Sequence, residues 1–145
     1  MTANTLFGAR AYASVGLETG VLAADPHRLI DMLYEGALLS IARAQVHMAA
    51  GHIAEKGAAV SRAVQIIDEG LKASLNLEAG GGLAQQLWQL YGYMARRLLL
   101  ASLRNEAAGF DEVTRLLKDL RDAWRQIDQR ANKPAPGEPR AALAA

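Results

Sequence analysis

The residues best suited to chemistry are three histidines, a glycine triplet and a pair of adjacent arginines. A di-iron helical bundle takes its ligands from Glu-x-x-His pairs on facing helices, but no glutamate here has a histidine three residues on. His27, His47 and His52 stand near expected helix ends, without a carboxylate cluster of metal-ligand spacing. We expect His27, which follows a proline at a helix start, to have a capping or packing role. We therefore expect no metal and no other cofactor.

The glycine triplet and the arginines also lack the context that catalysis or phosphate binding requires. No lysine and hydroxyl residue follow Gly80, Gly81 and Gly82 as they would in a phosphate-binding loop, so we expect a linker there. Arg96 falls on the polar arc of its helix and Arg97 at the margin, so both are expected to be solvated or to face a partner. The chain has no cysteine, which excludes a cysteine nucleophile and a thiolate metal site. These patterns indicate a binding protein that is not an enzyme.

Net charge and hydropathy bear on the partners and the compartment. A net charge of +1 gives the whole chain no attraction to nucleic acid or to an anionic membrane. The first 22 residues lack an apolar core of signal-peptide length, and no stretch stays free of charge for the ~20 residues of a membrane span. The sequence predicts a soluble, single-domain, cytoplasmic protein.

The elements that must position these residues are helices. Hydrophobic residues make up 51% of the chain but aromatics only 6%, so much of the apolar content is Ala and Leu, both strong helix formers. Asp25 followed by Pro26 is a helix-start signal, and glycines at 51, 80–82 and 109 are expected stops. The predicted helices span 26–50, 53–77, 83–107 and 111–131.

Short connections leave adjacent helices antiparallel, so we predict an all-α fold: an antiparallel up-down four-helix bundle over residues 25–131. Residues 1–24 are predicted to be an irregular N-terminal segment. Residues 132–145 contain three prolines and are predicted to be a disordered tail.

Two of the predicted helices carry more apolar surface than one core-facing stripe needs. On the third, a core stripe of Leu83, Leu87, Leu90, Met94, Leu98 and Ala101 is flanked by Ala84, Trp88, Tyr91, Ala95 and Leu99. The second helix repeats the pattern around Val60, Ile67 and Leu71. Central helices with two neighbours each would explain this excess, and so would a groove for a partner helix. Periodicity leaves both explanations open.

Several runs in the chain resemble the flagellin-specific export chaperones of bacterial flagella, the FliS family. The resemblance extends from about Ala11 to Trp124. It rests most on Pro-His-x-Leu-Ile-x-Met-Leu-Tyr-x-Gly at 26–36 and on Leu-Tyr-x-Tyr-Met-x-Arg-Arg-Leu at 90–98, with Ala11-Tyr12 and Val15, the run 63–72, Leu75-Asn76 and Ala123-Trp124 between and around them. Both long runs are specific in order and spacing.

The resemblance implies a cytoplasmic chaperone for type III flagellar export. Its ligand would be the disordered C-terminal segment of flagellin, held in apolar grooves so that it neither polymerises early nor loses competence for export. The expected groove residues are Ile66, Leu71, Leu75, Trp88, Tyr91 and Ala95. An N-terminal lid of Phe7, Tyr12 and Val15 is expected to cover part of the groove; Tyr12 is the residue that matches the family's lid tyrosine.

The chain is expected to have further partners, and it departs from the family's sequence pattern at one position. The export gate and a co-chaperone or anti-sigma factor are further candidate partners, and monomer and homodimer are both open. Gly92 stands where the family commonly has a polar or acidic residue, which puts any contact from that position in doubt. The alternative is a helical adaptor or a self-associating scaffold, for which Met32, Leu39 and Val46 at seven-residue spacing would provide a stripe.

Overall fold

The computed structural model describes residues 25–132 of the chain. The predicted lid residues Phe7, Tyr12 and Val15, and the predicted tail beyond Asn132, lie outside the described residues. The described part contains α2 (Pro26–Ala50), α3 (Ile53–Gln65) continued by the π-helical segment η2 (Ile66–Lys72), α4 (Gly81–Arg104) and α5 (Ala107–Asn132).

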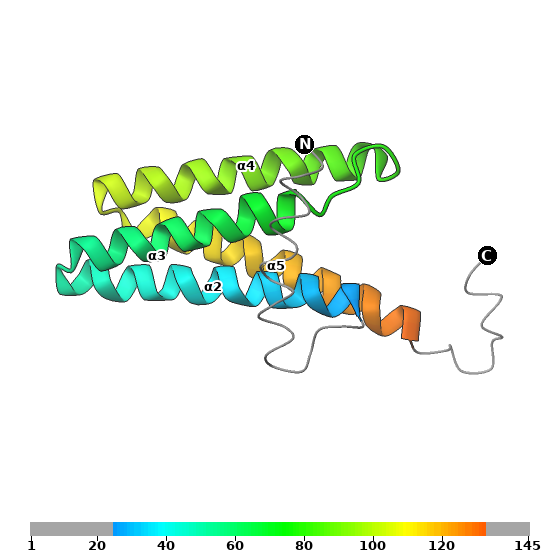
Figure 1. Cartoon of the computed structure of the whole chain (residues 1–145), viewed down its shortest axis with the longest axis horizontal. Helices are drawn as coiled ribbons and strands as arrows, with labels where there is room; N and C mark the ends of the chain where they lie inside the picture. Colours follow the sequence, from blue (N-terminus) through cyan, green and yellow to red (C-terminus); the bar gives the residue numbers. More distant parts are fainter. Residues whose placement is uncertain (1–24, 133–145) are drawn as a thin grey trace.

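The arrangement of these helices confirms the predicted bundle. Successive helices reverse direction along one long axis (Figure 1). α2 packs against α3 and α5, and α4 packs against α5 and against α3 with η2. Each helix therefore has two lateral neighbours, as in an antiparallel up-down four-helix bundle. The largest fully buried side chains come from all four helices: Phe110, Ile41, Ile67, Met94, Leu98, Leu117 and Val113.

Local signals set the two ends of α2 as predicted. The Asp25 carboxylate accepts a hydrogen bond from the His27 N–H at 3.0 Å, and Pro26 is the first helical residue, where its missing N–H costs nothing. At the other end Gly51 has φ 77°, and its N–H bonds back to the last turn. A residue without Cβ takes this left-handed conformation at little cost.

The second helix ends at Lys72, so the predicted end at Leu77 was wrong. Its last seven residues widen into the π-helical segment η2, which an apolar repeat cannot reveal because it records only the average helical period. In η2 the Gly70 backbone comes so close to α2 that a Cβ there would lie 3.0 Å from Leu33 Cδ2. Within the π-helical segment, the Gly70 backbone therefore packs directly against a side chain of α2.

Gly109 does not separate the last two helices, so that prediction was also wrong. α4 ends at Arg104, and the residue that caps it, Asn105, has φ 54°; asparagine tolerates the left-handed conformation better than most residues. α5 already includes Gly109 in its first turn, where a Cβ would lie 2.6 Å from Ala101 Cβ. The glycine allows α5 to approach α4 closely.

The connection before α4 lies earlier in the chain than predicted, at residues 73–80, and includes only the first glycine of the triplet. Gly81 and Gly82 are the first residues of α4, and Gly80 is its N-cap. Gly81 has φ 58°, a backbone conformation that residues with a Cβ rarely adopt. No helix in the described range 25–132 is both long and apolar enough to cross a bilayer.

Candidate partner-binding surface

The outer face of α4 carries many large apolar side chains that remain accessible to solvent. Leu83 is 66% exposed, so its predicted place in the core was wrong; α4 has only just begun there, and no neighbouring helix covers this position deeply. The exposed large apolar residues of α4 are Leu83, Trp88, Tyr93, Leu99, Leu100 and Leu103.

Three of these residues lie on one arc of α4. At about 100° per residue, Trp88, Leu99 and Leu103 fall within an arc of about 60° of the helix circumference. Their exposed fractions are 44%, 51% and 78%. Gly92 lies within the same arc, and its backbone is next to Lys72 of η2. This α4 stripe, defined as Trp88, Leu99 and Leu103, therefore lies on the side of α4 that is turned towards η2.

A cationic and aromatic cluster stands at the Trp88 end of the α4 stripe. The Lys72 ammonium lies over the Trp88 indole, 3.9 Å from the ring centroid, in cation–π geometry. A Cβ placed on Gly92 would be 3.6 Å from Lys72 Nζ and 3.4 Å from an Arg96 guanidinium nitrogen. The Lys72 and Arg96 side chains therefore approach each other over Gly92, which has no side chain of its own, and Lys72 also covers the Trp88 ring.

The structure divides the six predicted groove residues between core and surface. Ile66, Leu71 and Tyr91 belong to the core cluster, and Leu75 packs against it, partly buried. Ala95 is also buried, at 6% exposure. Only Trp88 of the six is exposed. The structure thus gathers these residues in and around one region of η2 and α4, with most of them beneath the surface.

A pair of tyrosine hydroxyls connects α2 to α4 through the core. The Tyr34 and Tyr91 hydroxyl oxygens lie 2.6 Å apart and are buried. Burial raises the pKa of Tyr91, and the neighbouring Tyr34 hydroxyl raises it further. Burial also raises the pKa of Tyr34, and the hydrogen bond shared with Tyr91 only partly offsets that rise. Both groups are thereby held in the neutral form that satisfies the shared hydrogen bond.

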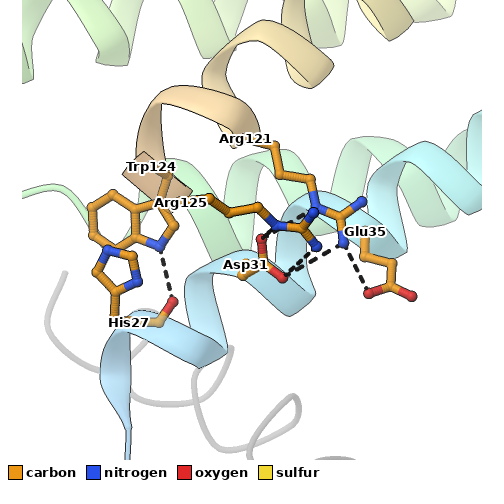
Figure 2. A network of polar contacts seen from close by, with 6 residues as sticks. All are labelled: His27, Asp31, Glu35, Arg121, Trp124 and Arg125. Carbon is orange, nitrogen blue, oxygen red and sulfur yellow. Dashed lines mark hydrogen bonds and ion pairs between the residues drawn. The ribbon is translucent and has the colours of Figure 1, made fainter. Parts of the chain in front are cut away.

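The start of α2 is fixed to the far end of α5 by an aromatic stack. The rings of His27 and Trp124 are stacked, with centroids 3.9 Å apart and an angle of 8° between their planes (Figure 2). The Trp124 indole N–H donates to the His27 carbonyl at 2.8 Å. The packing role predicted for His27 is confirmed.

One turn further along α2, Asp31 receives two arginines of α5. Arg125 Nε donates to Asp31 Oδ1 at 2.7 Å, and Arg121 Nε donates to the same oxygen at 3.2 Å (Figure 2). Arg121 also reaches Glu35 at 3.1 Å. Burial opposes ionisation of Asp31, but the hydrogen bonds from Arg125 and Arg121 outweigh it, so the pKa of Asp31 lies below its usual value.

The two adjacent arginines of α4 differ in their surroundings. Arg97 Nε donates to Glu112 of α5 at 2.9 Å, and its Nη1 lies 3.4 Å from Glu106. Tyr93 donates to the same Glu112 carboxylate at 2.6 Å. Hydrogen bonds from Tyr93 and then Arg97 lower the pKa of Glu112. Arg97 therefore joins α4 to α5 within the chain, so the solvated or partner-facing role predicted for it was wrong. Arg96 is exposed, as predicted.

Sequence reasoning overlooked one buried cation, Lys56. Its side chain is 7% exposed, and its ammonium donates to the Ser102 carbonyl at 2.8 Å and to Asn105 Oδ1 at 2.6 Å. These acceptors are at the C-terminal end of α4, where backbone carbonyls lack helical partners. Lys56 precedes Val60 by four residues and so falls on the core-facing stripe of α3, which is the signal that could have revealed it.

Comparison with known proteins shows to which family this chain belongs. The family described as "Flagellar protein FliS" matches residues 8–131, most of the chain. The chain belongs to the FliS family. The resemblance predicted from the runs at 26–36 and 90–98 is thereby confirmed.

Individual FliS relatives match over nearly their whole length. The flagellar secretion chaperone FliS of Salmonella typhimurium is 47% identical over 128 residues, which are 88% of this chain and 95% of the relative. The protein of the same name from Escherichia coli K12 is 40% identical, over 82% of this chain and 88% of its own. That of Bacillus subtilis is 32% identical, over 83% and 88%.

Proposed function

We propose that this FliS-family protein is a cytoplasmic, non-enzymatic chaperone of type III flagellar secretion. Its ligand is the C-terminal segment of flagellin, which it binds on apolar surface so that the subunit neither polymerises early nor loses its competence for export. The observation that carries the proposal is the 47% identity to a flagellar secretion chaperone across 95% of that relative.

The α4 stripe supplies a surface suited to such a ligand. Trp88, Leu99 and Leu103 are spaced along α4 so that an amphipathic helix laid beside it could bury all three. Fully burying a large apolar side chain contributes about 1.5–3 kcal/mol. The ligand also loses conformational entropy when it folds on the surface, which offsets part of that gain.

The predicted groove and lid residues belong to this proposal. Trp88 contacts the ligand directly, while Ile66, Leu71, Leu75, Tyr91 and Ala95 shape the surface from beneath. The N-terminal lid residues Phe7, Tyr12 and Val15 cover part of this surface until flagellin displaces them. The export gate and a co-chaperone or anti-sigma factor would bind elsewhere on the bundle.

The second candidate function is that of a helical adaptor or a self-associating scaffold. The observation that favours it is on α2, where Leu39 is 49% and Val46 is 66% exposed. They share a seven-residue spacing with Met32, which is partly buried. A scaffold of this kind would form a defined oligomer without flagellin.

The proposal is tested by calorimetric titration of the full chain with the last ~40 residues of flagellin from the same organism, a length that offers several helical anchors. We expect one-to-one binding with a negative heat-capacity change, the marker of apolar burial. Absence of binding at micromolar concentrations, with both samples intact, together with a defined oligomer in sedimentation, would favour the scaffold.

A matched pair of variants locates the binding surface. Trp88→Ala removes the aromatic residue of the α4 stripe and is expected to weaken binding about tenfold or more. Ile127→Ala removes an apolar side chain of α5 that is 55% exposed and lies outside this stripe, so its affinity should stay within about twofold of the unaltered chain. Equal losses in both variants would contradict the assignment of the surface to α4.

A further inference from the structure

We propose that Lys72, Trp88 and Arg96 form a carboxylate-binding subsite that receives an acidic side chain of the docked segment. The inference rests on the proposed function and adds a charge requirement to it. The bound segment would place an Asp or Glu at the Trp88 end of the α4 stripe, next to apolar residues that cover the stripe itself.

The geometry of the subsite comes from the absence of a side chain at Gly92. The position that a Cβ on Gly92 would occupy is 3.6 Å from Lys72 Nζ and 3.4 Å from Arg96 Nη1. The two cations thus approach each other over Gly92 without a group of this chain between them. Lys72 is also held over the Trp88 ring at 3.9 Å, which reduces the freedom that an exposed lysine would lose on binding.

Positive charge at the subsite exceeds the negative charge of the carboxylates near it. Within residues 25–127, no ion pair or hydrogen bond joins Lys72 or Arg96 to a carboxylate, whereas Arg97, Arg121 and Arg125 all have carboxylate partners. The acids nearest to Lys72 in sequence are Glu69 and Asp68, and neither makes an ion pair or hydrogen bond with it. Burial raises the pKa of Asp68, and Lys72 only partly opposes that rise. Among the described residues, the two cations therefore have no direct carboxylate partner, and Lys72 interacts with Asp68 only over a longer distance.

A carboxylate fits this arrangement better than another polar group. Its two oxygens can accept hydrogen bonds from the ammonium and the guanidinium together, and such charge-assisted bonds are stronger than neutral ones. The Trp88 indole shields one side from water, which strengthens the attraction. From Trp88 to Leu103 the α4 stripe is about 22 Å long, so one amphipathic helix could occupy the stripe and the subsite together.

The first test places a competing carboxylate on the chaperone. Gly92→Asp supplies an acid between Lys72 and Arg96, and Gly92→Asn supplies a side chain of the same shape without charge. We expect Gly92→Asp to bind the ~40-residue flagellin segment about three- to tenfold more weakly than Gly92→Asn, as fits one charge-assisted contact. Equal affinities for the two variants would overturn the subsite. Far-ultraviolet circular dichroism and thermal unfolding verify that both are folded.

The second test removes the cations and the ligand's acids in turn. Lys72→Gln and Arg96→Gln should each weaken binding about three- to tenfold, and the matched control Lys118→Gln, an exposed lysine of α5, should not. Replacing the Asp and Glu residues of the segment one at a time should identify one whose loss is not additive with Lys72→Gln. Additive losses at every acid would overturn the subsite.

The outcome for the unaltered chain separates the two proposals. If the unaltered chain does not bind the segment, the proposed function fails and the subsite fails with it. If it binds and the charge variants behave like their controls, only the subsite fails, and the chaperone function stands on apolar contacts alone.

Discussion

At Gly92 and Gly109 a helical backbone lies buried against a neighbour, but the surroundings of the two glycines differ. A Cβ on Gly92 would make ordinary contacts of 3.4 and 3.6 Å with the ends of Arg96 and Lys72. A Cβ on Gly109 would lie 2.6 Å from Ala101 Cβ and 3.1 Å from the Arg97 guanidinium. Long side-chain ends can move aside, whereas the Ala101 methyl is fixed to the α4 backbone.

These surroundings predict that replacement by alanine stabilises the fold at one glycine and destabilises it at the other. Gly92→Ala should raise the free energy of unfolding by about 0.5–1 kcal/mol, because glycine is the costlier residue in a helix interior. Gly109→Ala should lower it by about 1–3 kcal/mol, because α5 must move away from α4. Urea unfolding of both variants measures the difference. A stabilised Gly109→Ala variant would contradict the close approach of the two helices.

Asp31 predicts how stability depends on pH. Its pKa is lower in the folded chain than in the unfolded chain, so its contribution is present above the unfolded value of about 3.9 and is lost as pH falls through the folded value. Asp31→Asn should cost about 1–3 kcal/mol at pH 7. The cost should shrink below about pH 4. Thermal unfolding from pH 7 to pH 3 tests this, and a cost independent of pH would exclude an ionised Asp31 as its source.

At the scale of elements, the end of α4 depends on a side chain from α3. Lys56 donates to the Ser102 carbonyl and to Asn105, whose left-handed backbone ends the helix. The bond to Asn105 also orients the residue that turns the chain into α5. One lysine thus connects the start of α3 to the α4–α5 turn.

Lys56→Met keeps the length of the side chain and removes its charge. We expect a loss of about 1–3 kcal/mol, because acceptors at the end of α4 lose their donor. Amide hydrogen exchange should become faster at Asn105 and Glu106, whose N–H groups bond to the last turn of α4. The control Lys118→Met should change neither. Unchanged exchange at these two amides would show that the turn holds without Lys56.

At the scale of the whole bundle, Tyr34 and Tyr91 connect two helices through the core. Their hydrogen bond joins α2 to α4, two helices that each pack mainly against other neighbours. The bond therefore acts across the bundle and restricts how the two helix pairs can slide past each other. Tyr91 is also next in sequence to Gly92, over which Lys72 and Arg96 approach each other.

A double-mutant cycle measures this cross-bundle bond. Tyr34→Phe and Tyr91→Phe should each cost about 1–2 kcal/mol, since each leaves a buried hydroxyl without a partner. The double variant should be no less stable than the worse single variant, because both hydroxyls are then gone. Urea unfolding gives all three values. Additive losses would mean that the two hydroxyls do not act as a pair.

Both hydroxyls also bear on stability at high pH. The pKa of Tyr34 and of Tyr91 is raised in the folded chain, so their contribution is complete below the unfolded value of about 10 and is lost as pH rises above it. The double variant should therefore lose less stability than the unaltered chain between pH 9 and pH 11.

Much of this protein could be predicted from its sequence. Asp25, Pro26 and Gly51 mark the ends of α2 because capping depends on groups within one turn of the helix end. The apolar repeats predicted four helices, and short connections predicted their antiparallel order, since both follow from local geometry. The runs at 26–36 and 90–98 predicted the family, which the comparisons confirm.

Other features were decided only by contacts between helices. Gly70 in η2 lies against the Leu33 side chain, and Gly109 in α5 lies against the Ala101 methyl, and neither approach can be read from a helical period. The division of the predicted groove residues into a buried set and an exposed Trp88 depends on which sides of η2 and α4 the neighbouring helices cover. A helical period states which residues share a face, but only the packed bundle determines how much of that face is left for a partner.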